Sequence, residues 1–208
     1  LERLSVDGIA IDELYLAWDF TVASSDSLAS RLLHMREVAY NGLDDDGAPG
    51  FTVTSQTEDG AVRRVNGTLL DPNFLTGDGA PSSTFSLDDS GMPQRNSDQP
   101  DFVAEFHCVL PLAATEPVPG IVYGHGLLGT RMEVDALSFA AESGALGACA
   151  TDEIGMSTPD VENLAVILGD LSHFKEQADR MQQGLLNQQF LGRLMNSSAG
   201  FSRSAAFQ

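Results

Sequence analysis

Basic residues are scarce in this sequence. Its 208 residues include 11 Lys and Arg against 30 Asp and Glu, which gives a formal net charge of −19 at pH 7. A nucleic-acid-binding protein needs a basic stripe to neutralise phosphates, and docking on an anionic membrane surface needs basic clusters. The composition therefore argues against both kinds of partner. Acidity of this size is typical of a solvated surface that keeps a protein soluble.

Cysteines, aromatic residues and long apolar runs are also few. The two cysteines, Cys108 and Cys149, match neither a zinc-site spacing nor a C-x-x-C redox motif. Aromatic residues make up 7% of the chain, yet apolar residues reach 42%, which is enough to build a core. No apolar stretch is long enough to span a bilayer. The length fits one medium domain, or one domain with a small partner.

The two ends of the sequence lack the usual signals of a complete chain. Residues 1–4 (LERL) have neither a Met nor the charged-then-apolar order of a signal peptide. Residues 205–208 (AAFQ) offer no helix stop. We therefore expect the sequence to be the interior of a longer protein.

The first 50 residues predict a connector made of a strand and a helix. Residues 9–22, IAIDELYLAWDFTV, alternate loosely and favour a strand. Residues 24–26 (SSD) offer N-caps for a helix through Tyr40 that ends with a left-handed stop at residues 41–42 (NG). The apolar face of this helix is predicted to comprise Leu28, Leu32, Met35 and Val38.

From residue 51 the pattern changes to strands. Residues 51–57 and 61–70 are rich in Val and Thr and flank E-D-G, which predicts a hairpin. Residues 71–100 are rich in Pro, Gly, Ser and Asp and predict a long surface loop. Residues 102–110 predict a strand whose one face carries Phe102, Ala104, Phe106 and Cys108.

The remaining sequence alternates short apolar strands with helices, which favours a parallel arrangement. Strands are predicted at 120–124 and 146–151, and a helix at 131–143. Thr158 is predicted to cap a short helix, and Ser172 a long one that runs to about Met195. The long helix has a broad apolar face, predicted to pack against the sheet, that comprises Phe174, Ala178, Met181, Leu185, Leu186, Phe190 and Leu194.

One segment carries a recognisable chemical motif. Residues 119–129, PGIVYGHGLLG, place H-G-L-L-G directly after a short buried strand. This resembles the oxyanion-hole loop of α/β-hydrolase lipases and esterases, in which backbone N–H groups stabilise the charge that develops on a carbonyl oxygen. The resemblance implies that Leu127 contributes such an N–H, while His125 and Gly126 shape and brace the loop. The alternative is a glycine-rich connection in another α/β fold.

A second motif supports the same resemblance. Residues 149–157, CATDEIGMS, resemble the D-x-x-G-x-S turn after the next strand of that fold, which implies pocket-shaping roles for Asp152, Gly155 and Ser157. Residues 51–208 as a whole, with VNGTLLDPNFL and QADRMQQGLLN, resemble large bacterial extracellular lipase-like proteins. The implied fold is the first half of an α/β-hydrolase sheet, a mostly parallel sheet with antiparallel early strands. Residues 1–50 would be the connector that precedes it.

The nucleophile of that family is missing from the sequence. No G-x-S-x-G is present, and the nearest approach, N-S-S-A-G around Ser198, follows a helix instead of a strand. We therefore expect the serine, the acid and the histidine beyond Gln208, so that this chain alone is inactive. The resemblance implies a secreted or cell-surface serine esterase or lipase that uses no cofactor and acts on small-molecule or lipid esters.

Two other functions stay open. The chain could be a non-catalytic hydrolase-like binding module, or an acidic module that binds calcium or a protein through the turn at residues 44–47 (DDDG). The resemblance also predicts the strand neighbours, with 102–110 antiparallel to 146–151 and 120–124 on the far side of the latter. A register that sets Cys108 opposite Gly147 favours two buried free thiols over a disulfide.

Overall fold

The computed structural model describes residues 6, 8, 10, 12, 14–16, 18, 20–43 and 47–208. Contacts divide the chain into two units, residues 1–30 and 31–208. In the first unit, the described residues of the predicted strand 9–22 form no strand, and the others lie outside the description. Helix α2 (Ser25–Asn41) begins in this unit, where the Ser24 hydroxyl accepts a hydrogen bond from the Ser27 N–H at 3.0 Å, as an N-cap does.

In the second unit, α2 buries only part of the predicted face. Met35 and Ala39 are buried, whereas Val38 is exposed. The helix ends as predicted near Gly42, whose N–H donates to the carbonyls of Val38 and Ala39. Gly42 does not adopt the left-handed conformation that the sequence predicts there. The hydrogen bonds to the preceding turn close the helix without it.

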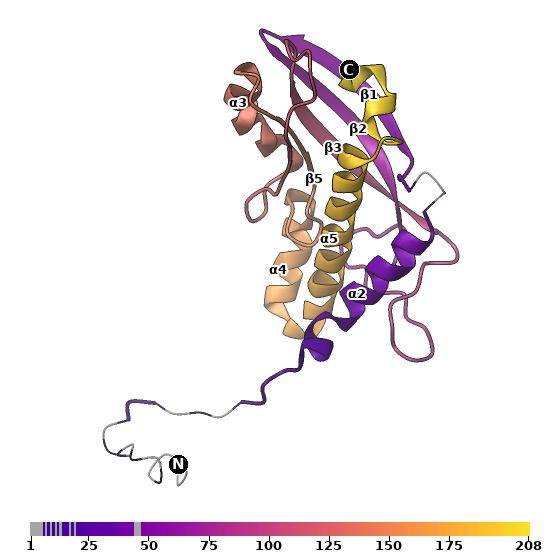
Figure 1. The fold of residues 1–208 in the computed structure, drawn as a ribbon. Helices are drawn as coiled ribbons and strands as arrows, with labels where there is room; N and C mark the ends of the chain where they lie inside the picture. Colours follow the sequence, from indigo (N-terminus) through magenta and orange to yellow (C-terminus); the bar gives the residue numbers. More distant parts are fainter. Residues whose placement is uncertain are drawn as a thin grey trace. The chain divides into compact units, whose positions relative to one another are not determined.

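In the described part of the chain, five strands form one mixed sheet (Figure 1). They are β1 (Phe51–Asp59), β2 (Val62–Pro72), β3 (Asp101–Pro111), β4 (Gly120–Tyr123) and β5 (Gly147–Thr151), in the spatial order β1-β2-β3-β5-β4. The β4–β5 pair is parallel and the other three pairs are antiparallel. The mixed α/β class, the antiparallel early strands and the position of β5 between β3 and β4 are therefore confirmed. The prediction that the sheet is mostly parallel is corrected for the described strands, because three of the four pairs are antiparallel. Only the helical segment between β4 and β5 joins two neighbouring strands in the described part of the chain.

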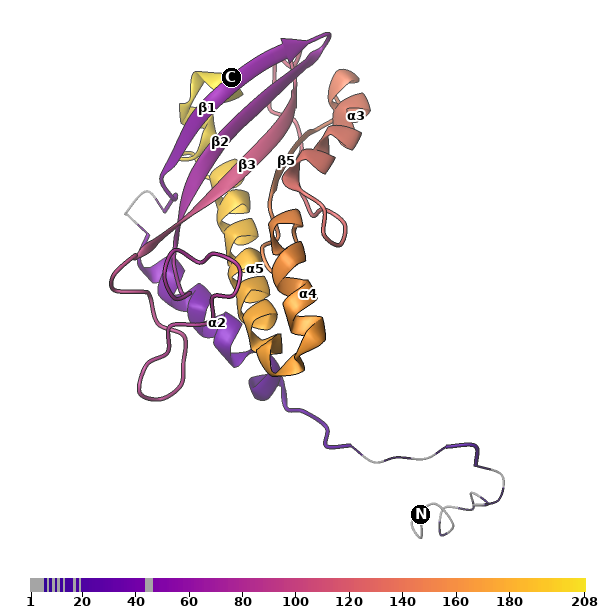
Figure 2. The same ribbon diagram turned by 180° about the vertical axis from the view of Figure 1, so that it is seen from behind.

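Helices cover both faces of the sheet (Figures 1 and 2). On one face, α5 (Phe174–Asn196) and the second half of α2 pack over residues of β2, β3 and β5. On the other face, the 3-10 helix η2 (Arg131–Leu137) and helix α3 (Ser138–Glu142) cover a smaller cluster that includes Val109 and Ala148. The predicted helix at 131–143 is thus a 3-10 turn that continues as a short α-helix.

The caps of the later helices differ from those predicted. Ser157, one residue before the predicted Thr158, caps η3 (Thr158–Asp160), which leads into α4 (Val161–Gly169). Asp170, and not Ser172, caps η4 (Leu171–His173), because its side chain accepts the Ser172 N–H at 3.0 Å. Two more 3-10 turns, η5 (Phe201–Arg203) and η6 (Ala205–Phe207), follow α5. No helix in the described part of the chain is both long and apolar enough to cross a membrane.

The buried face of α5 is only partly the predicted one. Leu186, Phe190 and Leu194 are buried, whereas the predicted core residues Phe174, Met181 and Leu185 are 56%, 37% and 48% exposed. In their place the helix buries polar side chains, namely Asp179, Arg180, Gln183 and Asn187. Apolar periodicity failed there because these polar groups are hydrogen-bonded to backbone and to other side chains, which offsets the cost of their burial.

The segment 73–100 binds that polar face. It is the predicted loop, except that residues 71–72 belong to β2 and part of the loop is buried. This fully described segment contains no helix and only isolated bridges, yet Phe74, Leu75 and Phe85 are buried in the main core. The Gln183 side-chain oxygen accepts the Phe74 N–H at 3.0 Å, and Asp179 accepts the Phe85 N–H at 2.9 Å. Side chains of α5 therefore replace the pairing that a strand would supply.

The two cysteines form a disulfide, which corrects the expectation of free thiols. Cys108 on β3 pairs directly with Cys149 on β5, and their Cα atoms are 4.0 Å apart. Gly147, the predicted partner of Cys108, lies two residues earlier on β5. The order of the strands was predicted correctly, but the predicted register was displaced by two residues, which is enough to separate the sulfur atoms.

Candidate functional site

The HGLLG loop, residues 125–129, leaves the end of β4 and is braced by a buried histidine. The Nε2 atom of His125 accepts the Glu153 N–H at 2.8 Å, and its Nδ1 atom lies 2.7 Å from the Gly126 carbonyl oxygen. A neutral imidazole carries one donor and one acceptor nitrogen, so Nδ1–H donates to Gly126. The ring therefore links the loop to the turn that follows β5.

The loop makes a tight bend at Leu128. This residue has φ +59°, a left-handed conformation that costs a non-glycine residue roughly 1–2 kcal/mol. The bend is maintained by two backbone bonds, from Leu128 N–H to the Met156 carbonyl at 2.7 Å and from Gly129 N–H to the Gly126 carbonyl at 2.9 Å. Such strain is found at sites where the surrounding structure determines a backbone direction.

One amide at the tip of the loop is left free. The Gly126 N–H donates to the Glu133 carboxylate at 3.0 Å, and the N–H groups of Leu128 and Gly129 are bonded as above. The Leu127 N–H has no hydrogen-bond acceptor among the described residues, and Leu127 is 74% exposed. A Cβ at Gly129 would overlap the Glu133 carboxylate, which crosses the loop at this point. The tip of the loop thus combines an exposed residue with an N–H that has no acceptor among the described residues.

The 152–157 turn lies beside the HGLLG loop. Gly129 and Ser157 form a parallel bridge, and the Thr158 N–H donates to the Gly129 carbonyl at 2.9 Å. Asp152 accepts the Arg131 N–H at 2.7 Å and binds the Arg131 guanidinium at 2.6 Å. Asp152 and Ser157 therefore both connect the turn to the loop and its continuation. That they shape a substrate pocket stays a prediction.

Neither Ser157 nor Ser198 is placed as a catalytic nucleophile would be. Ser157 is buried, and its hydroxyl donates to Asp160 at 2.7 Å. Ser198 lies in the exposed turn after α5, so no strand precedes it. Neither position has the strand-to-helix geometry of a nucleophile elbow.

Sequence reasoning missed three residues around the loop. Glu133 binds the Gly126 N–H, Asp160 binds the 152–157 turn, and Arg180 of α5 pairs with Asp160. The spacing S-x-x-D at residues 157–160 resembles a capping box and could have indicated Asp160. No local pattern could have indicated Glu133 or Arg180, because their partners are determined by the fold.

Away from the loop, two buried carboxyl groups have raised pKa values, but the described residues form no metal site. Burial raises the pKa of Asp71 well above its usual value, and burial also raises the pKa of Asp179. No cluster of His, Cys, Asp or Glu that could hold a metal is present among the residues that the structure describes. The acidic turn that suggested calcium includes residues 44–46, which lie outside the described residues.

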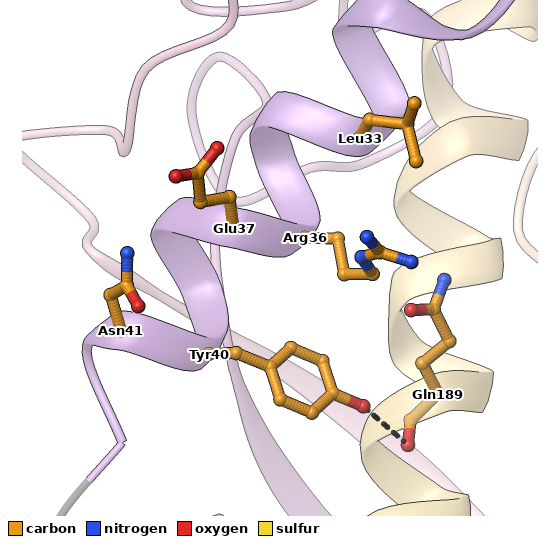
Figure 3. Close-up of a pocket in the computed structure, with 6 residues that line it drawn as sticks. All are labelled: Leu33, Arg36, Glu37, Tyr40, Asn41 and Gln189. Carbon is orange, nitrogen blue, oxygen red and sulfur yellow. Dashed lines mark hydrogen bonds between the residues drawn. The ribbon is translucent and has the colours of Figure 1, made fainter.

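A groove of about 610 Å³ lies between α2 and α5 (Figure 3). The side chains of Arg36 and Gln189 point toward each other across it, and the Tyr40 hydroxyl donates to the Gln189 carbonyl at 3.3 Å. Burial raises the pKa of Tyr40. The six lining residues are Leu33, Arg36, Glu37, Tyr40, Asn41 and Gln189. They include no Ser, Cys or His, so the groove lacks a nucleophile with a base beside it.

Comparisons of the sequence find no matching protein-family model and no significantly similar curated protein. Comparison of the fold finds solved esterases. Acetyl xylan esterase 1 from a Thermoanaerobacterium species has 11% identity and a TM-score of 0.39 over 66% of this chain. A provisionally assigned acetyl xylan esterase from Bacteroides fragilis has 10% identity and a TM-score of 0.45 over 89%. The glucuronoyl esterase from Solibacter usitatus has 13% identity and a TM-score of 0.28 over 64%.

The chain spans 33%, 46% and 37% of the length of these three structures, in the same order. All three likenesses are low in identity and in TM-score. The function proposed below therefore depends on the geometry of the HGLLG loop.

Proposed function

We propose that this chain is part of a serine carboxylic-ester hydrolase, of the esterase or lipase class, and that the HGLLG loop is its oxyanion loop. The supporting observation is that the N–H of the exposed residue Leu127 has no acceptor among the described residues, whereas the neighbouring N–H groups of the loop are bonded. A donor of this kind stabilises the negative charge that develops on the carbonyl oxygen during acyl transfer. Removal of one such donor costs about 2.7–4 kcal/mol of transition-state stabilisation.

The rigidity of the loop supports this assignment. An oxyanion donor is effective when it is already oriented before the reaction, because no reorganisation is then needed. His125 links the loop to the turn after β5, and Leu128 bonds to Met156 on the same turn. A free N–H on an otherwise well-bonded loop is therefore suited to a pre-oriented role.

The catalytic serine, acid and histidine are proposed to lie beyond Gln208. Neither Ser157 nor Ser198 has nucleophile geometry, and a strand-to-helix G-x-S-x-G turn would complete the site. In this proposal the intact enzyme acts on small-molecule or lipid esters through an acyl-enzyme, uses no cofactor and acts outside the cell. Residues 51–208 would form the first part of the hydrolase core, after a connector at residues 1–50.

The decisive test removes the Leu127 N–H and also makes the Gly126 carbonyl, which accepts the Gly129 N–H and bonds His125, a weaker ester acceptor. In the full-length gene product, Leu127 is replaced by its α-hydroxy acid analogue, which converts the amide N–H into an ester oxygen and keeps the side chain. We expect kcat for p-nitrophenyl esters to fall about 10²- to 10³-fold, in a protein that is still folded at the assay temperature. The same ester substitution at Ala114, an exposed residue after β3, is the control. Equal activity of the two variants would refute the oxyanion assignment.

A further inference from the structure

A buried ion pair links α5 to the 152–157 turn. Arg180 and Asp160 are 3% and 4% exposed, and both the Nε and Nη2 atoms of Arg180 bind Asp160 Oδ1, at 2.9 and 2.8 Å. The third nitrogen of the guanidinium, Nη1, donates to the carbonyl of Gly79 in the segment 73–100. One side chain therefore contacts two segments that are distant in the sequence.

The other oxygen of Asp160 organises the 152–157 turn. Its Oδ2 atom accepts three hydrogen bonds, from Gly155 N–H at 2.8 Å, from Ser157 N–H at 3.0 Å and from the Ser157 hydroxyl at 2.7 Å. Gly155 has φ +93°, and a Cβ there would contact Met181 at 2.7 Å. The turn thus lies against α5, and one carboxylate oxygen binds two of its backbone N–H groups and one hydroxyl.

The 152–157 turn and the adjoining Thr158 are hydrogen-bonded to the HGLLG loop. The Met156 carbonyl accepts the Leu128 N–H at 2.7 Å, and Thr158 binds the loop twice, through its N–H to Gly129 at 2.9 Å and through its hydroxyl to the Leu128 carbonyl at 2.8 Å. These bonds fix the peptide plane next to Leu127. A displacement of the 152–157 turn would therefore change the direction of the Leu127 N–H.

We propose that Asp160 and Arg180 are positioning residues for the HGLLG loop, and that Arg180 couples this loop to the segment 73–100. The proposal rests on the proposed oxyanion function of the loop. A buried ion pair is a poor source of net stability, because desolvation of the two charges offsets their attraction. Here the pair supplies directional bonds that an apolar pair could not, three to the turn and one to Gly79.

The test uses Arg180→Lys in the full-length gene product, since lysine keeps the buried positive charge but lacks the planar fork. A misplacement of about 1 Å in an active site can cost about 10²-fold in rate. We therefore expect kcat to fall roughly ten- to a hundredfold with KM changed less than about twofold. Hydrogen exchange at the Leu128 and Thr158 amides should become faster. Asp160→Asn, which weakens the three acceptor bonds, should have the same two effects.

The matched control is Asp179→Asn, on the neighbouring residue of α5. Asp179 is also buried and also binds the segment 73–100, at the Phe85 N–H, but no bond from it to the 152–157 turn is found among the described residues. Asparagine keeps a side-chain oxygen that can accept the Phe85 N–H, so this variant should leave kcat and the exchange of the two amides unchanged. Loss of kcat and amide protection to the same extent in Arg180→Lys and Asp179→Asn would overturn the coupling.

The exchange measurement separates this proposal from the proposed function. If the wild-type full-length protein hydrolyses no ester, the esterase assignment fails, whereas exchange at Leu128 and Thr158 still decides whether Arg180 positions the loop. If the enzyme is active but Arg180→Lys changes neither kcat nor exchange, the esterase assignment stands and the positioning role is refuted.

Discussion

Cys108 and Cys149 face each other across the antiparallel strands β3 and β5 and are joined by a disulfide buried in the core. The bridge closes a loop with a sequence separation of 41, which also contains β4 and α3. Asp152 directly follows Thr151, the last residue of β5. The same bridge therefore anchors, through β5, the turn that braces the HGLLG loop.

The first prediction concerns this disulfide. A thiol count under denaturing, non-reducing conditions should find no free cysteine. Removal of the bridge by Cys108→Ala with Cys149→Ala should lower the free energy of unfolding by about 3–4 kcal/mol, because the unfolded chain regains loop entropy. Denaturant unfolding of the double variant and the wild type measures this difference. Two titratable thiols in the wild type would contradict the structure.

The second prediction concerns Asp71, which is buried beside Asn187 and has one oxygen without a partner among the described residues. Burial raises its pKa in the folded protein well above the value of about 3.9 in the unfolded chain. The higher proton affinity of Asp71 in the folded state contributes to the free energy of unfolding. This contribution is fully present below about pH 4 and is lost as the pH rises through the raised pKa.

Asp71→Asn should consequently be more stable than the wild type at pH 7, by about 1.4 kcal/mol for each pH unit between the two pKa values. The difference should vanish below about pH 4. Urea unfolding at a series of pH values provides the measurement. Asp101→Asn, at a half-exposed residue paired with Arg95, leaves Asp71 in place and is the control, so its pH profile should run parallel to that of the wild type. Parallel pH profiles for Asp71→Asn and the wild type would rule out this account.

The third prediction concerns the two sides of α5. Leu186→Ala should lower the free energy of unfolding by about 2–5 kcal/mol, because Leu186 is fully buried and its truncation leaves a cavity. Met181→Ala should cost less than about 1 kcal/mol, since Met181 is 37% exposed. Both values come from chemical denaturation. Equal costs would show that Met181 belongs to the core after all.

The fourth prediction concerns Gly67 on β2. A Cβ at this position would collide with the carbonyl oxygen of Thr52 and with the ring of Phe106. Gly67→Ala should therefore destabilise the protein by about 1–3 kcal/mol through overpacking. Gly169→Ala, at the end of α4 where a Cβ meets nothing within 4 Å, should be neutral or slightly stabilising. Thermal unfolding of the two variants makes the comparison, and an unchanged melting temperature for Gly67→Ala would refute the collision.

The fifth prediction concerns the proposed catalytic serine. A serine-reactive phosphonate should label the full-length gene product and leave residues 1–208 unlabelled, because Ser157 is buried and Ser198 follows a helix. Mass spectrometry of the labelled peptide should locate a G-x-S-x-G serine beyond Gln208. Stoichiometric labelling of Ser157 or Ser198 would contradict this prediction. Absence of label in both proteins would favour a non-catalytic binding module.

Local patterns predicted the parts of the fold that local chemistry determines. The hairpin of β1 and β2 followed from E-D-G between two Val- and Thr-rich runs, and Gly60 indeed has φ +62° at the turn. The shared face of β3 followed from alternation. The position of the HGLLG loop directly after β4 likewise followed from the sequence, because a glycine-rich motif comes after a short apolar run.

Features that depend on distant partners could not be predicted in this way. The Cys108–Cys149 pair required the register of two strands to within one residue. Phe74 and Phe85 lie among turn-forming residues, so their burial has no periodic signal. Arg180 is one of several charged residues on α5, and nothing in its sequence context distinguishes it from the others. Only the fold shows that its partners are Asp160 and Gly79.

The attachment of segment 73–100 to α5 has a consequence for how the chain folds during synthesis. The bonds from Phe74 to Gln183 and from Phe85 to Asp179 span 109 and 94 residues of sequence. Closing such long loops costs entropy before any contact offsets it, so contacts of this kind form late. The β1–β2 hairpin can pair as soon as it leaves the ribosome. Segment 73–100 cannot bind α5 until α5 has been translated. Phe74 and Phe85 are therefore accessible to chaperones and to other chains during synthesis.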